Sequence, residues 1–310
     1  MIYTFTANPS LDKLFILNSL SIGQYNRGQV VQYDPGGKGI NVSRCLKELG
    51  DESIITGFFG GSVGDFLIEN LQAQGFEVDP IRIEGESRSN ITLIENFNGQ
   101  MTKLNEFGPV ASSKTMDLLL KKVEKRTKKG DVWVLSGSVL PGLPNGFYAI
   151  LIKKIHACGG LAFLDASGMW LIYGYQAVPF LVRINRSEAE TVIGKKLISK
   201  EDVFNAIKKF QNKGLAISVI SLDIEGAVFA DKTTTLEVFS PSVAARTVVG
   251  AGDAMMAMIV HGYLREWPFE KIAKWSVAAG SASVMKDGTS IAELELIQAL
   301  VEKVDLREIN

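Results

Sequence analysis

Short apolar runs alternate along the chain with longer segments in which apolar residues recur every three or four positions. Short runs of this kind predict buried strands, and the longer periodic segments predict helices that cover them. Strands that alternate with helices of ten or more residues are typical of a mainly parallel sheet covered on both faces, so we expect an α/β fold. The predicted strands are 2–7, 54–56, 131–135, 161–165, 180–184, 216–221, 226–230 and 234–239, and the predicted helices are 42–49, 65–74, 113–128, 146–156, 200–213 and a segment from 253 onward.

Two parts of the chain interrupt this alternation with short strands that have no helix between them. One pair of strands is expected at 14–17 and 29–33, and a second pair at 89–96 and 101–105, where Asn98-Gly99 is a strong hairpin signal. We therefore expect a single α/β domain over residues 1–310, with a small β-sheet lid inserted at about 13–33 and 88–107. Apolar strand faces exposed on such a lid predict a homodimer contact.

The most distinctive polar segment is Gly250-Ala251-Gly252-Asp253, between Val248-Val249 and a long apolar run. The two glycines let backbone N–H groups approach a ligand, and the start of a helix attracts anions. An acid beside a bound phosphoryl group is placed to accept the proton of an attacking hydroxyl. The alternative is that Asp253 only caps the helix, a role that Asp often fills.

A second glycine-rich segment, 34–41, has the sequence Asp-Pro-Gly-Gly-Lys-Gly-Ile-Asn and precedes the predicted helix 42–49. Asn41 is the expected N-cap of this helix and Gly50 the residue that ends it. Three glycines and Lys38 thus lie just ahead of a helix start, which predicts a second site for an anion or a polyol. Gly39 follows Lys38 where a Walker A loop has Ser or Thr, so this segment is not a P-loop.

The loop after the first strand offers another candidate, because α/β proteins often bind ligands at strand ends. Asp12 lies there, and an aspartate in an ordinary turn is the alternative interpretation. No Gly-x-Gly-x-x-Gly fingerprint follows this strand, which argues against a nicotinamide-dependent oxidoreductase.

Composition and charge narrow the classes of function. Lys and Arg number 33 and Asp and Glu 34, and a net charge of −1 argues against a general nucleic-acid binder. The chain has two histidines and two cysteines, Cys45 and Cys158, without metal-ligand spacing, so we expect buried thiols in a reducing compartment. The first residues lack a secretory pattern, and no run of 18 apolar residues occurs, so we expect a cytoplasmic protein that does not enter a membrane.

Five short motifs occur in order: Asn8-Pro9-Ser10-Leu11-Asp12, Pro35-Gly36-Gly37-Lys38-Gly39-Ile40-Asn41-Val42, Ser136-Gly137-Ser138, Asn185-Arg186-Ser187-Glu188 and Gly250-Ala251-Gly252-Asp253. Together they resemble the ribokinase/PfkB family of sugar kinases, nearest to its branch of 1-phosphofructokinases and tagatose-6-phosphate kinases. The resemblance covers essentially the whole chain. It implies a ribokinase-like fold, ATP-dependent phosphorylation of a sugar hydroxyl with Mg²⁺, and a dimer formed through the lid.

The resemblance also implies roles for single residues. Asp253 matches the catalytic base, and the backbone amides of Gly250, Ala251 and Gly252 match the anion hole. The expected substrate-binding residues are Asp12, Arg27, Gly36, Gly37, Lys38, Asn41, Arg88 and Ser138. The expected nucleotide-binding residues are Arg183, Asn185, Ser221, Asp223, Gly226, Gly250 and Gly252, and Glu188 with Asn185 matches the N-x-x-E motif that organises Mg²⁺ and phosphate.

Three positions depart from the family pattern. The family commonly has Lys-Pro-Asn where this chain has Arg183-Ile184-Asn185, so the charge stays and the proline is lost. Many members read Ser-Leu-Gly where this chain reads Ser221-Leu222-Asp223, which places an acid near the expected nucleotide. Ala254 replaces a Ser or Thr that commonly follows the catalytic base, so a hydroxyl is lost there but the base is kept.

The cations near the predicted lid bear on the substrate. A phosphorylated sugar needs a positive clamp at its far end, and Arg27, Lys38 and Arg88 are the candidates. They favour a ketohexose phosphate over a neutral sugar or a nucleoside, with a solvated surface charge as the alternative for each arginine. A non-catalytic sugar-phosphate sensor derived from a kinase also stays open, and ATP turnover separates it from a kinase.

Overall fold

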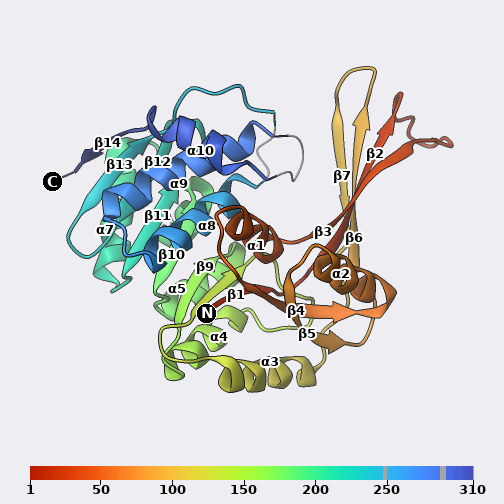
Figure 1. Ribbon diagram of the computed structural model, residues 1–310, viewed down its shortest axis with the longest axis horizontal. Helices are drawn as coiled ribbons and strands as arrows, with labels where there is room; N and C mark the ends of the chain where they lie inside the picture. Colours follow the sequence, from red (N-terminus) through yellow and green to blue (C-terminus); the bar gives the residue numbers. More distant parts are fainter. Residues whose placement is uncertain (247–249, 287–290, 310) are drawn as a thin grey trace.

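The computed structural model describes residues 1–246, 250–286 and 291–309 and has the predicted α/β architecture, with one large sheet, one small sheet and helices on both faces of the large one (Figure 1). The large sheet has the strand order β14-β13-β12-β11-β10-β9-β8-β1-β4-β5. Strands from β5 to β11 pair in parallel, and β12, β13 and β14 are added antiparallel at one edge. The bounds are β1 Ile2–Thr6, β4 Ile54–Gly60, β5 Glu77–Ile83, β8 Val132–Ser136, β9 Leu161–Asp165, β10 Leu181–Asn185, β11 Ile217–Ser221, β12 Gly226–Ala230, β13 Thr235–Phe239 and β14 Asp305–Glu308.

Helices bury both faces of this sheet. Helices α3 to α7 contribute to one buried cluster around Phe5, Trp133 and Phe147, and α1, α8, α9 and α10 contribute to a second around Val134 and Phe229. Their bounds are α1 Lys38–Glu48, α2 Gly61–Ala73, α3 Ser113–Arg126, α4 Phe147–Ala157, α5 Gly168–Gln176, α6 Arg186–Ile193, α7 Lys200–Asn212, α8 Ala251–Leu264, α9 Phe269–Val284 and α10 Leu294–Val301. Among the described helices, none is both long and apolar enough to cross a membrane.

The small sheet projects from the body of the molecule (Figure 1). Its order is β3-β2-β6-β7, built from β2 Ser10–Leu17, β3 Gln29–Gly36, β6 Arg88–Glu95 and β7 Met101–Asn105. The hairpin across Asn98-Gly99 is confirmed, with Gly99 at a φ of 70°. Strand β2 begins four residues before the predicted 14–17, because Ser10 to Leu17 pair residue by residue with β6. Asp12 therefore lies within a strand and not in a turn.

The two helices nearest the predicted site begin earlier than the polar pattern suggests. Helix α1 begins at Lys38 with Gly37 as its N-cap, so the prediction that Asn41 is the N-cap is wrong. Helix α8 begins at Ala251 with Gly250 as its N-cap, so Asp253 does not cap the helix. Both N-caps have positive φ, 124° for Gly37 and 87° for Gly250, which glycine adopts readily.

Other elements follow the prediction with shifts of a few residues at their ends, except that α5, α6, α9, α10, β5 and β14 are additional. Helix α5, Gly-Met-Trp-Leu-Ile-Tyr-Gly-Tyr-Gln, has no polar face in its sequence, so its periodicity gives no helical signal. Cys45 is buried as expected, whereas Cys158 at the end of α4 is partly exposed, and both thiols are free.

Candidate active site

The start of α8 places Asp253 inside the protein. Gly250 takes the left-handed conformation that turns the chain into the helix, and Asp253 is the third helical residue, with 5% of its surface exposed. Helix α8 is buried on nearly every side, as its apolar sequence predicts. The first N–H groups of a helix have no partner within it, so the Gly250–Gly252 turn presents donors beside this carboxylate. Val248 and Val249, which precede this turn, lie outside the described residues.

Asn41 holds the Asp253 carboxylate. Its side-chain amide donates a 2.8 Å hydrogen bond from Nδ2 to Oδ2 of Asp253. The amide oxygen of Asn41 is buried and accepts no hydrogen bond from any residue that the structure describes. Buried acceptors are normally satisfied, so this oxygen is available to a hydroxyl of a ligand. The same side chain thus offers an acceptor and contacts the carboxylate of Asp253.

The surroundings of Asp253 hold its pKa near neutrality. Burial raises the pKa to about 6, the positive charge of Lys38 opposes the rise, and the negative charge of Asp165 adds to it. A general base works best when its pKa lies near the operating pH. Asp253 is therefore suited to accept a proton at neutral pH.

A buried ion cluster lies next to this carboxylate at the carboxyl ends of β9 and β10. Asp165 accepts hydrogen bonds from Nζ of Lys38 at 2.6 Å and from Nη1 of Arg183 at 2.9 Å. Burial alone would raise the pKa of Asp165, but the two cations hold it below its usual range. Burial alone would lower the pKa of Lys38, and Asp165 and Asp253 reverse that effect. Asp165 was not among the site residues predicted from the sequence, although its place at the end of a predicted parallel strand is a recognised site position.

Arg183 packs against the first turn of α8 from the ends of the strands in the large sheet. It is 7% exposed, and its Nη2 donates a 3.0 Å hydrogen bond to Oγ of Ser221 at the end of β11. A Cβ on Gly252 would overlap the Arg183 guanidinium, so the Gly252 backbone lies directly against it. Arg183 and Ser221 thus anchor the Gly250–Gly252 turn, while the Arg183 Nε has no partner within the described chain.

The N-x-x-E segment forms the first turn of α6. Asn185 Oδ1 accepts from the backbone N of Glu188, and Glu188 Oε2 accepts from the backbone N of Asn185, which is a reciprocal capping box. Burial raises the pKa of Glu188, and the charges of Asp165, Lys38 and Arg183 also act on it, so Glu188 faces the ion cluster. Only Oε2 of Glu188 accepts a hydrogen bond from the described residues, so Oε1 is available to a cation or its water shell.

Glu188 and Asn185 are better suited to bind Mg²⁺ together with phosphate and water than to bind a metal ion by protein side chains alone. No group of three or more His, Cys, Asp or Glu residues in the described ranges is arranged to hold a metal ion. Mg²⁺ is usually bound by one or two carboxylates together with phosphate oxygens and water. Glu188 with Asn185 fits that donor set.

Asp12 lies in a second polar cluster on the small sheet. Ser10 Oγ and Asn90 Nδ2 donate to Asp12 Oδ1 at 2.7 and 2.8 Å. The amide oxygen of Asn90 is buried and has no partner among the described residues, like that of Asn41. A Cβ on Gly36 would overlap the Asp12 carboxylate, so only glycine permits this approach. The contacts of Ser10 and Asn90 with Asp12 were not predicted from the sequence, because they depend on the register of β2 against β6.

The three candidate clamp cations do not converge within one chain. Arg88 is half-buried beside this cluster, where it donates to the backbone oxygens of Asn8 and Glu106 at 3.2 and 3.3 Å. Lys38 points instead to Asp165. Arg27 is exposed in the loop joining β2 and β3, beyond Leu17. Leu17 pairs with Glu95, and the strand from Arg88 to Glu95 spans about 23 Å at about 3.3 Å per residue, so Arg27 and Arg88 lie toward opposite ends of the small sheet.

The remaining candidates lie at strand ends of the large sheet. Ser138 follows Gly137, where an added Cβ would be in van der Waals contact with the Lys38 side chain and whose N–H donates to the Asp165 backbone oxygen at 3.0 Å. Asp223 is exposed in a short turn after β11 and has a φ of 52°. Gly226, with a φ of 113°, allows the close approach of Val238 and Ser240 that a side chain would block.

Comparisons with known proteins show the family of the chain. Residues 8–295 match the model of the pfkB family carbohydrate kinases. The chain belongs to the pfkB family. It is therefore a phosphotransferase with an alcohol group as acceptor.

Similar pfkB proteins cover the chain end to end. It is 31% identical to a 1-phosphofructokinase of Borreliella burgdorferi, over all of this chain and 99% of the relative. It is 27% identical to a tagatose-6-phosphate kinase of Staphylococcus epidermidis, over the full length of both. The crystal structure of phosphofructokinase-2 from Escherichia coli in complex with potassium superposes with a TM-score of 0.93 at 27% identity, covering 97% of this chain and 98% of that one. The ribokinase-like fold expected from the sequence is thus confirmed.

Proposed function

We propose that the protein transfers the γ-phosphoryl group of ATP to a hydroxyl of a ketohexose phosphate. The observation that carries the proposal is the buried Asp253, held by Asn41 at the start of α8 with a pKa of about 6. The relatives named 1-phosphofructokinase and tagatose-6-phosphate kinase support a phosphorylated hexose as acceptor.

The transfer needs one base and one site for developing charge. Asp253 accepts the proton of the acceptor hydroxyl as its oxygen forms a bond to the γ-phosphorus, while the bond from that phosphorus to the bridging oxygen breaks and ADP leaves. The N–H groups of Gly250, Ala251 and Gly252 stabilise the charge on the transferring group. The start of α8 thus combines proton acceptance with phosphoryl binding.

The sugar binds between the two polar clusters. Asp12 and the amide oxygens of Asn41 and Asn90 accept hydrogen bonds from its hydroxyls, with Gly36, Gly37 and Ser138 in backbone or side-chain contact. Arg88 binds the phosphate that the sugar already carries, while Lys38 stays paired with Asp165. The half-buried position of Arg88 beside Asp12 supports this assignment.

The nucleotide binds over the ends of β10 and β11. Arg183, Ser221, Asp223 and Gly226 shape this side of the site. Glu188 and Asn185 would hold Mg²⁺, which supplies positive charge to the phosphates of ATP. The small sheet acts as a lid that excludes water during transfer.

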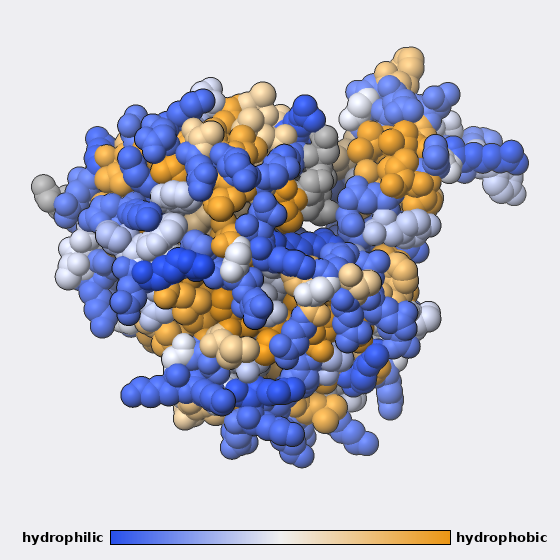
Figure 2. Space-filling view, in the orientation of Figure 1, coloured by the Kyte–Doolittle hydropathy of each residue, from blue (hydrophilic) through white to orange (hydrophobic). Residues whose placement is uncertain are grey.

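The small sheet is also the proposed homodimer contact. Val31, Tyr33, Met101 and Leu104 are exposed on its strands, and Figure 2 shows an apolar patch on this projection. Exposed apolar strand faces of this kind commonly mark an interface. Light scattering on the purified protein tests it: a mass of about one chain at micromolar concentration contradicts the dimer.

A coupled ADP-release assay with Mg-ATP tests the function. The acceptors are fructose 1-phosphate, fructose 6-phosphate, tagatose 6-phosphate, fructose, ribose and adenosine. Turnover with one ketohexose phosphate alone is the expected result. Turnover with ribose or adenosine alone contradicts a phosphosugar acceptor, and ATP binding without turnover on any acceptor would indicate a sensor.

A further inference from the structure

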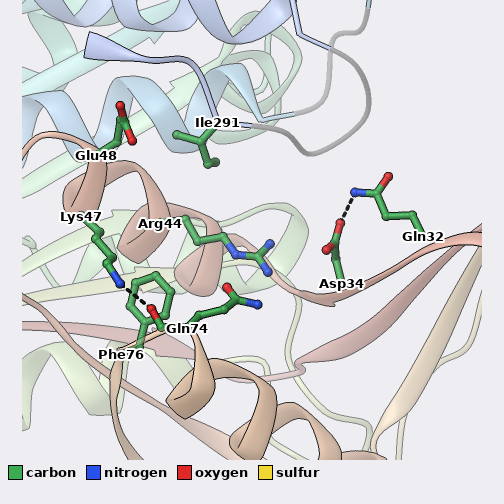
Figure 3. Close-up of a pocket in the computed structure, with 8 residues that line it drawn as sticks. All are labelled: Gln32, Asp34, Arg44, Lys47, Glu48, Gln74, Phe76 and Ile291. Atoms are coloured by element: carbon green, nitrogen blue, oxygen red, sulfur yellow. Dashed lines mark hydrogen bonds between the residues drawn. The ribbon is translucent and has the colours of Figure 1, made fainter.

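A pocket of about 580 Å³ lies outside the candidate active site, between α1, the end of α2 and strand β3 (Figure 3). Arg44 and Lys47 enter it from α1, and Gln32 and Asp34 enter it from β3. Its volume is in the range of small-molecule binding sites. None of these residues has a role in the phosphoryl transfer described above.

Arg44 is a cation without a matching acceptor. Its side chain is half-buried and makes no hydrogen bond or ion pair with any residue that the structure describes. Burial lowers its pKa, and the charges of Asp34 and Asp12 act in the opposite direction. Figure 3 shows the guanidinium reaching from α1 into the open space toward β3. A planar guanidinium presents five donors, and a phosphate or carboxylate is the acceptor that matches them.

Lys47 adds a second positive charge on the same face of α1. Its ammonium donates to the backbone oxygen of Gln74 and lies 4.7 Å from the centre of the Phe76 ring. These two contacts hold the charge at the rim of the pocket, one helical turn beyond Arg44. The α1 side of the pocket is therefore an anion-binding wall.

The opposite wall has the chemistry of a hydroxyl-binding surface. The side-chain amide of Gln32 donates to the carboxylate of Asp34 (Figure 3). The amide of Gln74 enters the pocket from the end of α2, on the side of Arg44 and Lys47 (Figure 3). Carboxylate and amide groups form hydrogen bonds with hydroxyls. The negative charge of Asp34 disfavours an anionic group of a ligand on the β3 side of the pocket. The pocket thus matches a molecule with one anionic end and several hydroxyls.

We propose that this pocket binds a small phosphorylated polyol, with its phosphate on Arg44 and Lys47 and its hydroxyls on Gln32, Asp34 and Gln74. The proposal concerns a site separate from the catalytic one and does not depend on turnover.

The two sites nevertheless share α1. Asn41, which donates to Asp253, lies one turn before Arg44 on this helix. A molecule in the pocket therefore contacts the helix that positions the proposed catalytic carboxylate.

Isothermal titration calorimetry with glycerol 3-phosphate tests the proposal, with glycerol and inorganic phosphate as partial probes. Arg44→Gln should weaken glycerol 3-phosphate binding about tenfold or more, because a charge-assisted contact is lost. The matched control is Arg82→Gln, which removes an exposed arginine paired with Asp65 on the molecular surface and should leave the affinity unchanged. Glycerol should not bind measurably, and inorganic phosphate should bind more weakly than glycerol 3-phosphate.

Several results would overturn the proposal. They are equal affinity in the wild type and Arg44→Gln, no binding by the wild type, and equal binding of glycerol. Binding that is lost in Arg88→Ala but kept in Arg44→Gln would assign the probe to the catalytic site and also overturn it. If the thermal midpoint shows that Arg44→Gln does not fold, Lys47→Gln replaces it, since Lys47 lies at the exposed rim. An unchanged affinity in that variant would again refute the pocket.

Discussion

Gly252 lies directly against the guanidinium of Arg183. A Cβ at Gly252 would lie 2.5 Å from Cζ and 2.7 Å from Nη2 of that arginine, well inside van der Waals contact. Arg183 cannot withdraw without losing its bonds to Asp165 and Ser221. This contact therefore fixes the first turn of α8, and Asp253 with it, against the strand ends of the large sheet.

Gly252→Ala should consequently destabilise the protein by about 2–3 kcal/mol, since the added methyl group overpacks a buried contact. It should also reduce kcat, because the turn that we propose to bind the phosphoryl group moves. Gly146→Ala is the matched control, since a Cβ there meets nothing within 4 Å and its φ is −80°. The control should cost less than about 1 kcal/mol. Equal unfolding free energies for the two variants in urea would contradict the close contact.

Asp253→Asn should lower kcat by roughly 10²–10⁴, the range for loss of a general base. Asparagine has nearly the same shape and remains within reach of Asn41, so the fold should persist. A loss of less than threefold in a folded variant would remove Asp253 from the role of base. Circular dichroism and the thermal midpoint provide the folding control.

The raised pKa of Asp253 also predicts two effects of pH. Activity needs the ionised carboxylate, so kcat/KM should rise about tenfold per pH unit below pH 6 and level off above it.

The stability of the protein should change in the opposite direction. The pKa of Asp253 in the folded protein lies above the ordinary 3.8, so its protonation favours folding at low pH, and this contribution is lost as pH rises toward 6. Asp253→Asn has no charge to bury, so its free energy of unfolding at pH 7 should exceed that of the wild type by a value on the order of 2–3 kcal/mol. An equal or lower stability would contradict the buried charge.

Arg88→Ala should raise KM for the ketohexose phosphate by about tenfold or more, because the phosphate of the sugar loses a charged hydrogen-bond donor. KM for ATP should stay nearly unchanged, because Arg88 is not proposed to contact the nucleotide. Arg82→Ala provides the control for a general change in charge, because Arg82 is paired with Asp65 on the surface. Steady-state kinetics with each substrate varied in turn gives both constants. Parallel increases in both KM values would argue against a phosphate clamp at Arg88.

Most of the fold could be predicted from the sequence, because alternating apolar runs and amphipathic segments report local burial. The starts of α1 and α8 could not, since their N-caps are glycines with positive φ and carry no polar capping signal. Asp165 was missed for another reason: its partner Lys38 lies 127 residues away, and only the assembled strand order brings them together. The assignment of Asp253, Asn41 and Asp12 to one catalytic site remains a prediction, as does a cytoplasmic location.

Asp165→Asn should destabilise the protein by about 3 kcal/mol, because Lys38 and Arg183 would keep their charges in a buried site without a counter-ion. The depressed pKa of Asp165 sets the pH dependence: its contribution is present at neutral pH and is lost as pH falls through the acid range. Wild type and variant should thus converge in stability in acid. Asp65→Asn, at the exposed pair with Arg82, should cost below about 1 kcal/mol. Similar losses in the two variants would contradict the role of the buried cluster.

Asp223 occupies a left-handed position, with a φ of 52°, where many family members have glycine. A side chain is strained there, so Asp223→Gly should stabilise the protein by about 0.5–1 kcal/mol in urea unfolding. The change also removes a negative charge beside the proposed nucleotide site, so KM for ATP should fall.

Asp223→Asn separates the two effects, because it removes the charge and keeps a side chain in the same conformation. If Asp223→Asn reproduces the fall in KM but not the gain in stability, charge governs nucleotide binding and backbone strain governs folding. No fall in KM in either variant would show that this carboxylate points to solvent and does not act on the nucleotide.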